Sequence, residues 1–205
     1  MIRLSVGYIF KMRDFEYLVK DNFFSKSELK FIWDELSAFH ELGLFKPAST
    51  HNSDYHKTTK AVLKTSDSFF LHEYYRQLSD SSIVNFTDKV INKEAVDFSK
   101  MCFANRSILG TQRSNFLVSY YSNNNDYKLH KDNAVTTALY WLCAEPKAFT
   151  GGDLYLSDLD EWVEFKSNRL VMFPSQAFHA VSPVTSSKKI PRGSGRYCIT
   201  QFFIN

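Results

Sequence analysis

The spacing of apolar residues changes from a helical period to a strand-like one near the middle of the chain. After Ser25, apolar residues recur every three or four positions, as on one face of a helix: Leu29, Ile32, Trp33, Leu36 and Phe39. Ser25 with Glu28 three residues later predicts the capped start of this helix. A short strand over residues 17–19 is predicted to precede it.

At least one further helix is predicted between residues 69 and 100. Its expected buried face consists of Ile83, Phe86, Val90 and Ile91. Residues 46–57 are rich in Ser, Asn and His and predict a loop between the two helical regions. No internal repeat or linker divides the chain, so residues 1–112 are expected to provide helical support and lead-in strands.

From about Arg113 onward, short segments rich in β-branched and aromatic residues alternate with turn signals. Seven strands are predicted, over residues 116–121, 134–142, 154–156, 162–165, 170–173, 177–181 and 197–203. Strands that follow helices indicate an α+β fold in which N-terminal helices buttress a β-sandwich or barrel over residues 113–205. A chain of 205 residues fits a single domain of this kind.

Composition limits the partners. A net charge of +3, without a stripe of basic residues interleaved with aromatic ones, argues against nucleic acid. No apolar run approaches membrane-spanning length, so no membrane association is expected. Cys102, Cys143 and Cys198 form no C-x-x-C motif and cannot all pair, which favours a reducing, cytoplasmic location. The oligomeric state is left open by the sequence.

The candidate chemistry lies in His130-Lys131-Asp132 and, further along the chain, in His179. His130 and Asp132 are two positions apart, so in an extended strand both side chains point to the same side. Two imidazoles and one carboxylate on one side of a metal form the facial triad of non-haem Fe(II) oxygenases, which leaves coordination positions open. The H-x-D pair alone also fits a surface histidine beside a solvated aspartate. The sequence motifs around this pair therefore decide between a metal site and a surface pair.

Five motifs, in order, resemble those of the 2-oxoglutarate/Fe(II)-dependent dioxygenases, in particular the prolyl-4-hydroxylase-like branch. They are Tyr120 with Tyr127-x-x-His130-x-Asp132, the apolar strand 136–142, Gly151-Gly152-Asp153-Leu154, the segment 169–174 followed by His179, and Gly195-Arg196-Tyr197. The resemblance covers residues 113–203. It implies a double-stranded β-helix, that is, a jelly-roll or cupin-like core, within one dioxygenase domain over residues 1–205.

The resemblance implies that His130, Asp132 and His179 bind Fe(II) and form the catalytic centre. It also implies that Arg196 binds the distal carboxylate of the cosubstrate 2-oxoglutarate, for which a guanidinium offers two parallel donors. Lys188 and Lys189 compete with Arg196, because some family members use a lysine about ten residues after the distal histidine.

Further roles are implied for the residues around this centre. The other expected cosubstrate contacts are Tyr120, Leu139, Trp141 and Thr200, and the expected substrate contacts are Asn133 and Tyr127. Trp141 stands where hypoxia-type prolyl hydroxylases have a tyrosine. An indole offers only an N–H and is bulkier than a phenol, so we expect Trp141 to shape the pocket without repeating the tyrosine's hydrogen bond.

The implied reaction hydroxylates an unactivated C–H of a peptide or protein side chain, with proline as the leading candidate. It consumes O2 and 2-oxoglutarate and releases succinate and CO2, and ascorbate is expected as a supporting reductant. The intact Asp132 favours hydroxylation over halogenation, which needs a small residue at this position. Two alternatives remain open, a hydroxylase of a free amino acid or other small molecule and a catalytically silent binding module. A zinc hydrolase is disfavoured because the chain has no H-E-x-x-H motif.

Overall fold

The computed structural model describes residues 15–47 and 62–205 and contains two facing β-sheets with helices on one side. The large sheet has the strand order β1-β10-β6-β13-β4-β3-β2 and the small sheet the order β5-β11-β8-β9, while β7 and β12 form a separate pair. Neighbouring strands in all three run antiparallel. This two-sheet arrangement is the predicted jelly roll.

The strands of the large sheet are β1 (Leu18–Asp21), β2 (Lys46–Pro47), β3 (Asp67–Phe70), β4 (Arg113–Tyr121), β6 (Thr136–Leu142), β10 (Arg169–Pro174) and β13 (Arg196–Ile204). The small sheet contains β5 (Tyr127–His130), β8 (Leu154–Leu156), β9 (Glu161–Val163) and β11 (His179–Val181). The separate pair is β7 (Thr150–Gly151) with β12 (Val184–Thr185). Each of the seven predicted strands is present, with ends that differ by a few residues.

The helices of the described chain are α1 (Lys26–Glu41), α2 (Ser82–Thr87) and α3 (Ala95–Met101), with 3-10 turns at η3 (Leu71–Glu73), η4 (Leu78–Asp80) and η6 (Ala104–Gly110) and a π-helical turn, η5 (Val90–Glu94). The predicted cap of α1 is confirmed, because the Ser25 hydroxyl accepts from the Glu28 N–H and the Glu28 carboxylate accepts from the Ser25 N–H. Ile32, Leu36 and Phe39 are buried on the predicted face.

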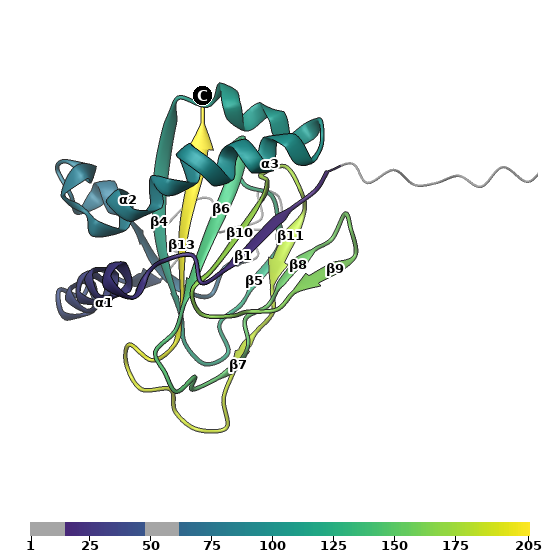
Figure 1. The fold of residues 1–205 in the computed structure, drawn as a ribbon. Coiled ribbons are helices and arrows are strands. Elements are labelled where there is room, and N and C mark those ends of the chain that lie inside the picture. The colour runs from purple at the N-terminus through teal and green to yellow at the C-terminus, as the bar shows by residue number, and fades with distance from the viewer. Residues whose placement is uncertain (1–14, 48–61) are drawn as a thin grey trace, which may run out of the picture.

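Two hydrophobic clusters fill the molecule, one on each face of the large sheet. The first joins α1, through Ile32 and Leu36, to sheet residues such as Val118 and Ile199. The second lies between the two sheets, as its members Leu154 and Leu156 of β8 and Val171 and Phe173 of β10 show. Figure 1 shows α1 and α2 on one side of the large sheet and the small sheet on the other. The space between the sheets is therefore the place where inward-facing side chains meet.

The structure corrects one helix prediction. Ile83 and Val90 are fully buried, but Ile91 is 50% exposed. These four residues do not lie on one continuous α-helix, since α2 ends at Thr87 and the next turn is π-helical. A π turn holds more residues than an α turn, so the apolar face shifts in phase and Ile91 points outward. Of the predicted loop at residues 46–57, residues 46 and 47 form β2 and the rest lies outside the described residues.

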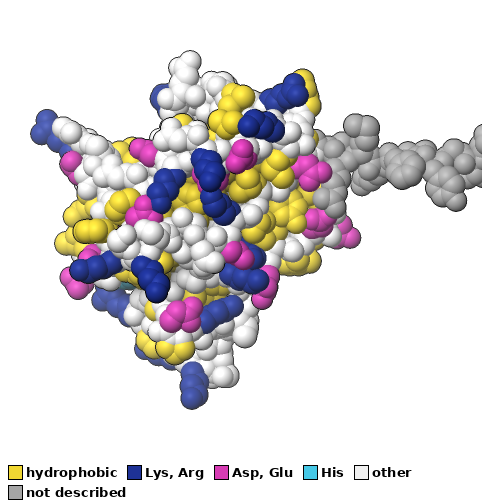
Figure 2. All heavy atoms as spheres, viewed as in Figure 1, with side chains coloured by type: hydrophobic (Ala, Val, Ile, Leu, Met, Phe, Trp, Pro, Cys, Tyr) yellow, Lys and Arg dark blue, Asp and Glu magenta, His cyan; other side chains and the backbone are white. Residues whose placement is uncertain are grey.

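The N-terminal half supplies strands as well as helices, because β1 pairs with β10 and β3 pairs with β4 in the large sheet. On the face shown in Figure 2, basic and acidic side chains are interspersed rather than gathered by sign.

In residues 15–47 and 62–205, no helix is both long and apolar enough to cross a membrane. Cys102, Cys143 and Cys198 are free thiols.

Candidate active site

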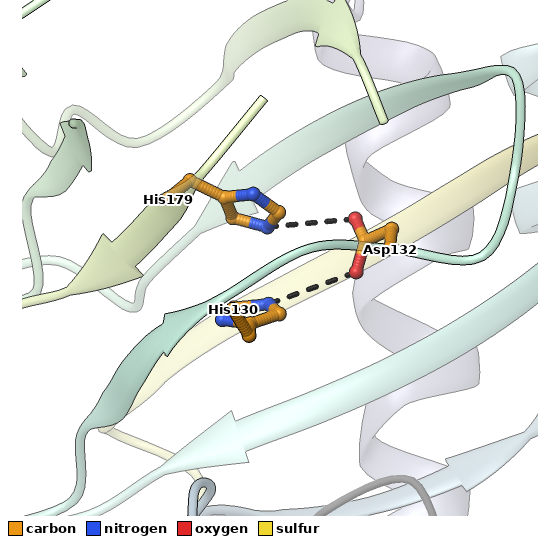
Figure 3. Close-up of side chains that lie close together, drawn as sticks. All are labelled: His130, Asp132 and His179. Atoms are coloured by element: carbon orange, nitrogen blue, oxygen red, sulfur yellow. Dashed lines mark ion pairs between the residues drawn. The ribbon is translucent and has the colours of Figure 1, made fainter. Parts of the chain in front are cut away.

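His130, Asp132 and His179 come together at one end of the small sheet. His130 is the last residue of β5 and pairs directly with His179, the first residue of β11, while Asp132 lies in the loop after β5 (Figure 3). The distances from Asp132 are 3.6 Å between Oδ1 and His130 Nε2 and 3.5 Å between Oδ2 and His179 Nε2. One ligand atom from each residue lies within 4.8 Å of the others. The predicted triad is thus assembled as a group that could hold one metal ion.

The backbone orients both imidazoles. His130 Nδ1 lies 2.7 Å from the Lys128 carbonyl and His179 Nδ1 lies 2.9 Å from the Ala177 carbonyl. A carbonyl only accepts, so each Nδ1 donates a proton to it, and Nε2 is the nitrogen of each ring that is placed to bind a metal. Burial, with His179 close by, holds the pKa of His130 well below its usual value, which favours the neutral ligand form. The donor set and its orientation fit a divalent transition metal.

Asp132 is held by residues that the sequence did not indicate. The Thr137 hydroxyl donates to Asp132 Oδ2 at 2.7 Å and lies 2.8 Å from the Ser175 hydroxyl. The Asp132 N–H donates to the Ser175 carbonyl at 3.0 Å. Outer hydrogen bonds of this kind fix the direction in which a metal-binding carboxylate points. Asp132 is therefore preorganised between the two histidines.

Arg196 lies at the start of β13 and is completely buried. Its Nε donates to the Gly152 carbonyl at 2.9 Å, but Nη1 and Nη2 have no hydrogen-bond partner among the described residues. The guanidinium carbon lies 4.8 to 5.3 Å from the ring centroids of Tyr121, Trp141 and Phe165. Leaving a buried charge without a partner is costly. The arrangement therefore indicates a site for an anion with two acceptor oxygens.

Glycine is required where the backbone meets this arginine. Gly152 has a φ of +77°, and a Cβ at this position would lie 2.6 Å from Arg196 Cδ. Both the left-handed backbone and the close approach exclude a side chain. Gly152 of the Gly151-Gly152 motif thus makes room for the Arg196 side chain.

Residues 116–204 match the family model of the 2OG-Fe(II) oxygenase superfamily. These residues, 89 of the chain's 205, form a 2OG-Fe(II) oxygenase domain. This family uses Fe(II), 2-oxoglutarate and O2, and the triad and the buried arginine lie within the matched residues. No curated protein matches the chain by sequence.

Solved structures of prolyl hydroxylases share the fold of this dioxygenase. A Pseudomonas putida prolyl-4-hydroxylase has a TM-score of 0.62 at 16% identity, covering 94% of each chain. A Trichoplax adhaerens prolyl hydroxylase, in complex with a hypoxia inducible factor peptide fragment, has a TM-score of 0.63 at 16% identity, with 92% of this chain and 83% of that one covered. The viral collagen prolyl hydroxylase of Paramecium Bursaria Chlorella virus-1 has a TM-score of 0.53 at 13% identity, with coverages of 91% and 94%.

Within the dioxygenase domain, alternate residues of β6 connect the triad to the arginine. Thr137 bonds Asp132, Leu139 is next on the same face and pairs with Thr200, and Trp141 lies beside Arg196. Residues two apart on a strand share a face. Trp141 is fully buried, and its Nε1 has no partner among the described residues. The structure thus brings Leu139, Thr200 and Trp141 to the side of the sheet that faces the site.

The structure corrects the position expected for Tyr120. Tyr120 belongs to the helix-side cluster, whereas Tyr121 lies in the cluster between the sheets, under the Arg196 guanidinium. Adjacent residues of a strand point to opposite faces, and the register pairs Arg196 with Tyr121. Two adjacent tyrosines at the end of a strand look alike in the sequence, so no sequence signal distinguishes the one that faces the site.

The remaining predicted residues lie nearer the surface. The Tyr127 ring stacks on His130 with centroids 3.5 Å apart, which places it beside the triad. Asn133 is exposed, one residue after Asp132. Lys188 and Lys189 are both exposed in the segment that precedes β13, unlike the buried Arg196.

One buried cation beside the site had no sequence signal. Lys64 is 2% exposed, and its Nζ donates to the Ser119 hydroxyl at 2.9 Å. The same Nζ lies 5.4 Å from the centroid of the Tyr127 ring, which stacks on His130. Lys64 follows the segment outside the described residues, and a β-bridge to Tyr127 holds it beside the site.

Proposed function

We propose that this dioxygenase hydroxylates a prolyl or other side chain of a peptide or protein. The observation that supports this most strongly is the likeness to prolyl hydroxylases over nearly the whole chain, one of them in complex with a peptide fragment. The intact Asp132 favours hydroxylation, because it occupies the position that a halogenating centre would leave for halide. The substrate contacts proposed on the chain are Tyr127, beside His130, and Asn133, just after Asp132.

The metal and cosubstrate residues have separate tasks in this proposal. His130, Asp132 and His179 hold Fe(II) through two Nε2 atoms and one carboxylate. Arg196 takes the distal carboxylate of 2-oxoglutarate through Nη1 and Nη2, the two donors without a partner in the described chain. When bound, Fe(II), 2-oxoglutarate and O2 supply the oxidising chemistry, with succinate and CO2 as coproducts.

The walls around the proposed cosubstrate position exclude water. Leu139 and Thr200 line the sheet between the two ends of the site, and Phe165 and Trp141 enclose the arginine. These groups are buried, so a charge-assisted hydrogen bond made there is stronger than one made in water. The protein's contribution is thus to bind, orient and keep dry the groups that react.

The test is turnover of a library of proline-containing peptides beside a panel of free amino acids, with Fe(II) and 2-oxoglutarate. We expect a mass increase of one oxygen atom on a peptide, matched by equimolar succinate. His179→Ala protein serves as the control without a metal site. Oxygen incorporation into a free amino acid, with every peptide unchanged, would replace the peptide proposal by the small-molecule one.

A further inference from the structure

The hydroxyl of Tyr120 organises the turn that leads into Arg196. Its Oη accepts hydrogen bonds from the Gly193 and Gly195 N–H groups, both at 3.1 Å, and lies 3.4 Å from the Pro191 carbonyl. The Ser194 N–H closes the same turn onto the Pro191 carbonyl at 3.0 Å. One side-chain oxygen therefore gathers three backbone groups of the segment 191–195.

This turn has little freedom where it meets the sheet. A Cβ on Gly195 would lie 2.3 Å from the Tyr121 carbonyl and 2.9 Å from the Tyr120 ring, so the chain passes directly against β4. The next residue is Arg196, whose side chain emerges on the opposite face of the sheet, over Tyr121. The position of the Gly195 backbone thus sets where the guanidinium begins.

Tyr120 and the turn at residues 191–195 are both held against α1. The Tyr120 ring lies against His40, with centroids 4.6 Å apart, and against Tyr197 at 4.9 Å. The Arg192 guanidinium donates to the His40 carbonyl. Burial of the Tyr120 ring in the helix-side cluster leaves its hydroxyl as the polar group directed at the turn.

We propose that Tyr120 is a positioning residue for Arg196. Tyr120 acts from the opposite face of the sheet and does not itself touch the cosubstrate. The inference rests on the proposed role of Arg196 as the carboxylate partner. Loss of the hydroxyl leaves two backbone N–H groups without their acceptor, so the turn relaxes and the guanidinium loses its fixed starting point. Because Arg196 Nη1 and Nη2 are held by no protein group among the described residues, the backbone and the bond from Nε to Gly152 set their direction.

The test is a double-mutant cycle on 2-oxoglutarate affinity, measured by calorimetry on the 205-residue chain loaded with Mn(II), under conditions without turnover. Tyr120→Phe should weaken binding about tenfold in the wild-type background, in the range seen when an outer hydrogen-bond partner is removed. In the Arg196→Met background the same change should weaken it less than about twofold, because there is no guanidinium left to position. Mn(II) affinity should stay unchanged in both.

Tyr197→Phe is the matched control, because it removes a hydroxyl from the same aromatic cluster while both glycine N–H groups keep their acceptor. We expect it to bind 2-oxoglutarate like the wild type. The positioning role is overturned if Tyr120→Phe has no effect, or an equal effect in both backgrounds. If instead Arg196→Met itself binds 2-oxoglutarate normally, the proposed cosubstrate site fails, and the two failures are distinguishable.

Discussion

Two buried arginines of the large sheet differ in how many of their hydrogen-bond donors have a partner. Arg169, at the start of β10, donates from Nε and Nη2 to the two carboxylate oxygens of Asp21 at 2.5 and 2.9 Å, and from Nη1 to the Glu164 carbonyl at 2.7 Å. Arg196, at the start of β13, has a partner only for Nε within the described chain. Both are less than 9% exposed. The hydrogen-bonding groups of Arg169 are thus satisfied within the protein, whereas two nitrogens of Arg196 have no partner among the described residues.

The difference separates a structural group from a binding group. The bidentate bond to Arg169 holds the pKa of the Asp21 carboxyl below its usual value and joins β1 to β10 at the edge of the sheet. The unpartnered donors of Arg196 destabilise the ligand-free protein, and an anion would offset that cost. A site that gives up stability for binding is expected at functional positions.

The largest expected effect concerns the metal end. We predict that His179→Ala abolishes turnover and severely weakens Fe(II) binding, because it removes one of three ligands. The bonds of Arg169 are remote from this change, so circular dichroism should show the native fold. Metal analysis decides the matter, and wild-type iron occupancy in the variant would remove His179 from the triad.

The second effect concerns the cosubstrate end. Arg196→Ala should raise the KM for 2-oxoglutarate at least about thirty-fold, since removing one partner of a buried charge-assisted pair costs about 2–5 kcal/mol. Lys188→Ala and Lys189→Ala should change it less than about threefold, because both lysines are exposed. A large effect from either lysine, with Arg196→Ala normal, would move the carboxylate site to the loop.

A smaller effect is expected from the support of Asp132. Thr137→Val keeps the shape of the side chain but removes the hydroxyl that donates to Oδ2. We predict that Fe(II) affinity falls about tenfold, at the lower end for an outer partner of a metal ligand. The affinity is measured by metal titration under anaerobic conditions. Unchanged affinity would mean that the backbone around Asp132 suffices to orient it.

The smallest effect is expected at Trp141. Its buried Nε1 has no partner in the described chain and lies in the ring system around Arg196, so it is available as a further donor. Trp141→Phe should raise the 2-oxoglutarate dissociation constant about threefold to tenfold, the value of one hydrogen bond. Calorimetry on the metal-loaded protein measures it. An unchanged constant would limit Trp141 to shaping the pocket, as first expected from the sequence.

The sequence revealed the parts of the site that depend on local pattern. Alternation along a strand places residues two apart on one face, as for Cys198 and Thr200, whose Sγ and Oγ1 atoms lie 3.8 Å apart. The triad and Arg196 were visible because each lies within a motif. Thr137 and Lys64 were not, because the course of the loop after β5 brings Asp132 to Thr137 and a β-bridge brings Lys64 to Tyr127. The outward turn of Ile91 depends on a π turn that no residue type announces.

The contrast between the two arginines is tested most directly by the rise in melting temperature that saturating 2-oxoglutarate causes. The rise is compared among three Mn(II)-loaded proteins, the wild type, Arg169→Met and Arg196→Met. At a hundredfold excess over the dissociation constant, the wild type should gain about 5–10 °C. Arg169→Met should melt several degrees lower without ligand, having lost bonds worth about 1.5–3 kcal/mol, yet keep the full rise. Arg196→Met should melt no lower than the wild type without ligand and retain at most about a third of the rise. A full ligand-induced rise in Arg196→Met, or its loss in Arg169→Met, would contradict the assignment of Arg196 as the binding arginine.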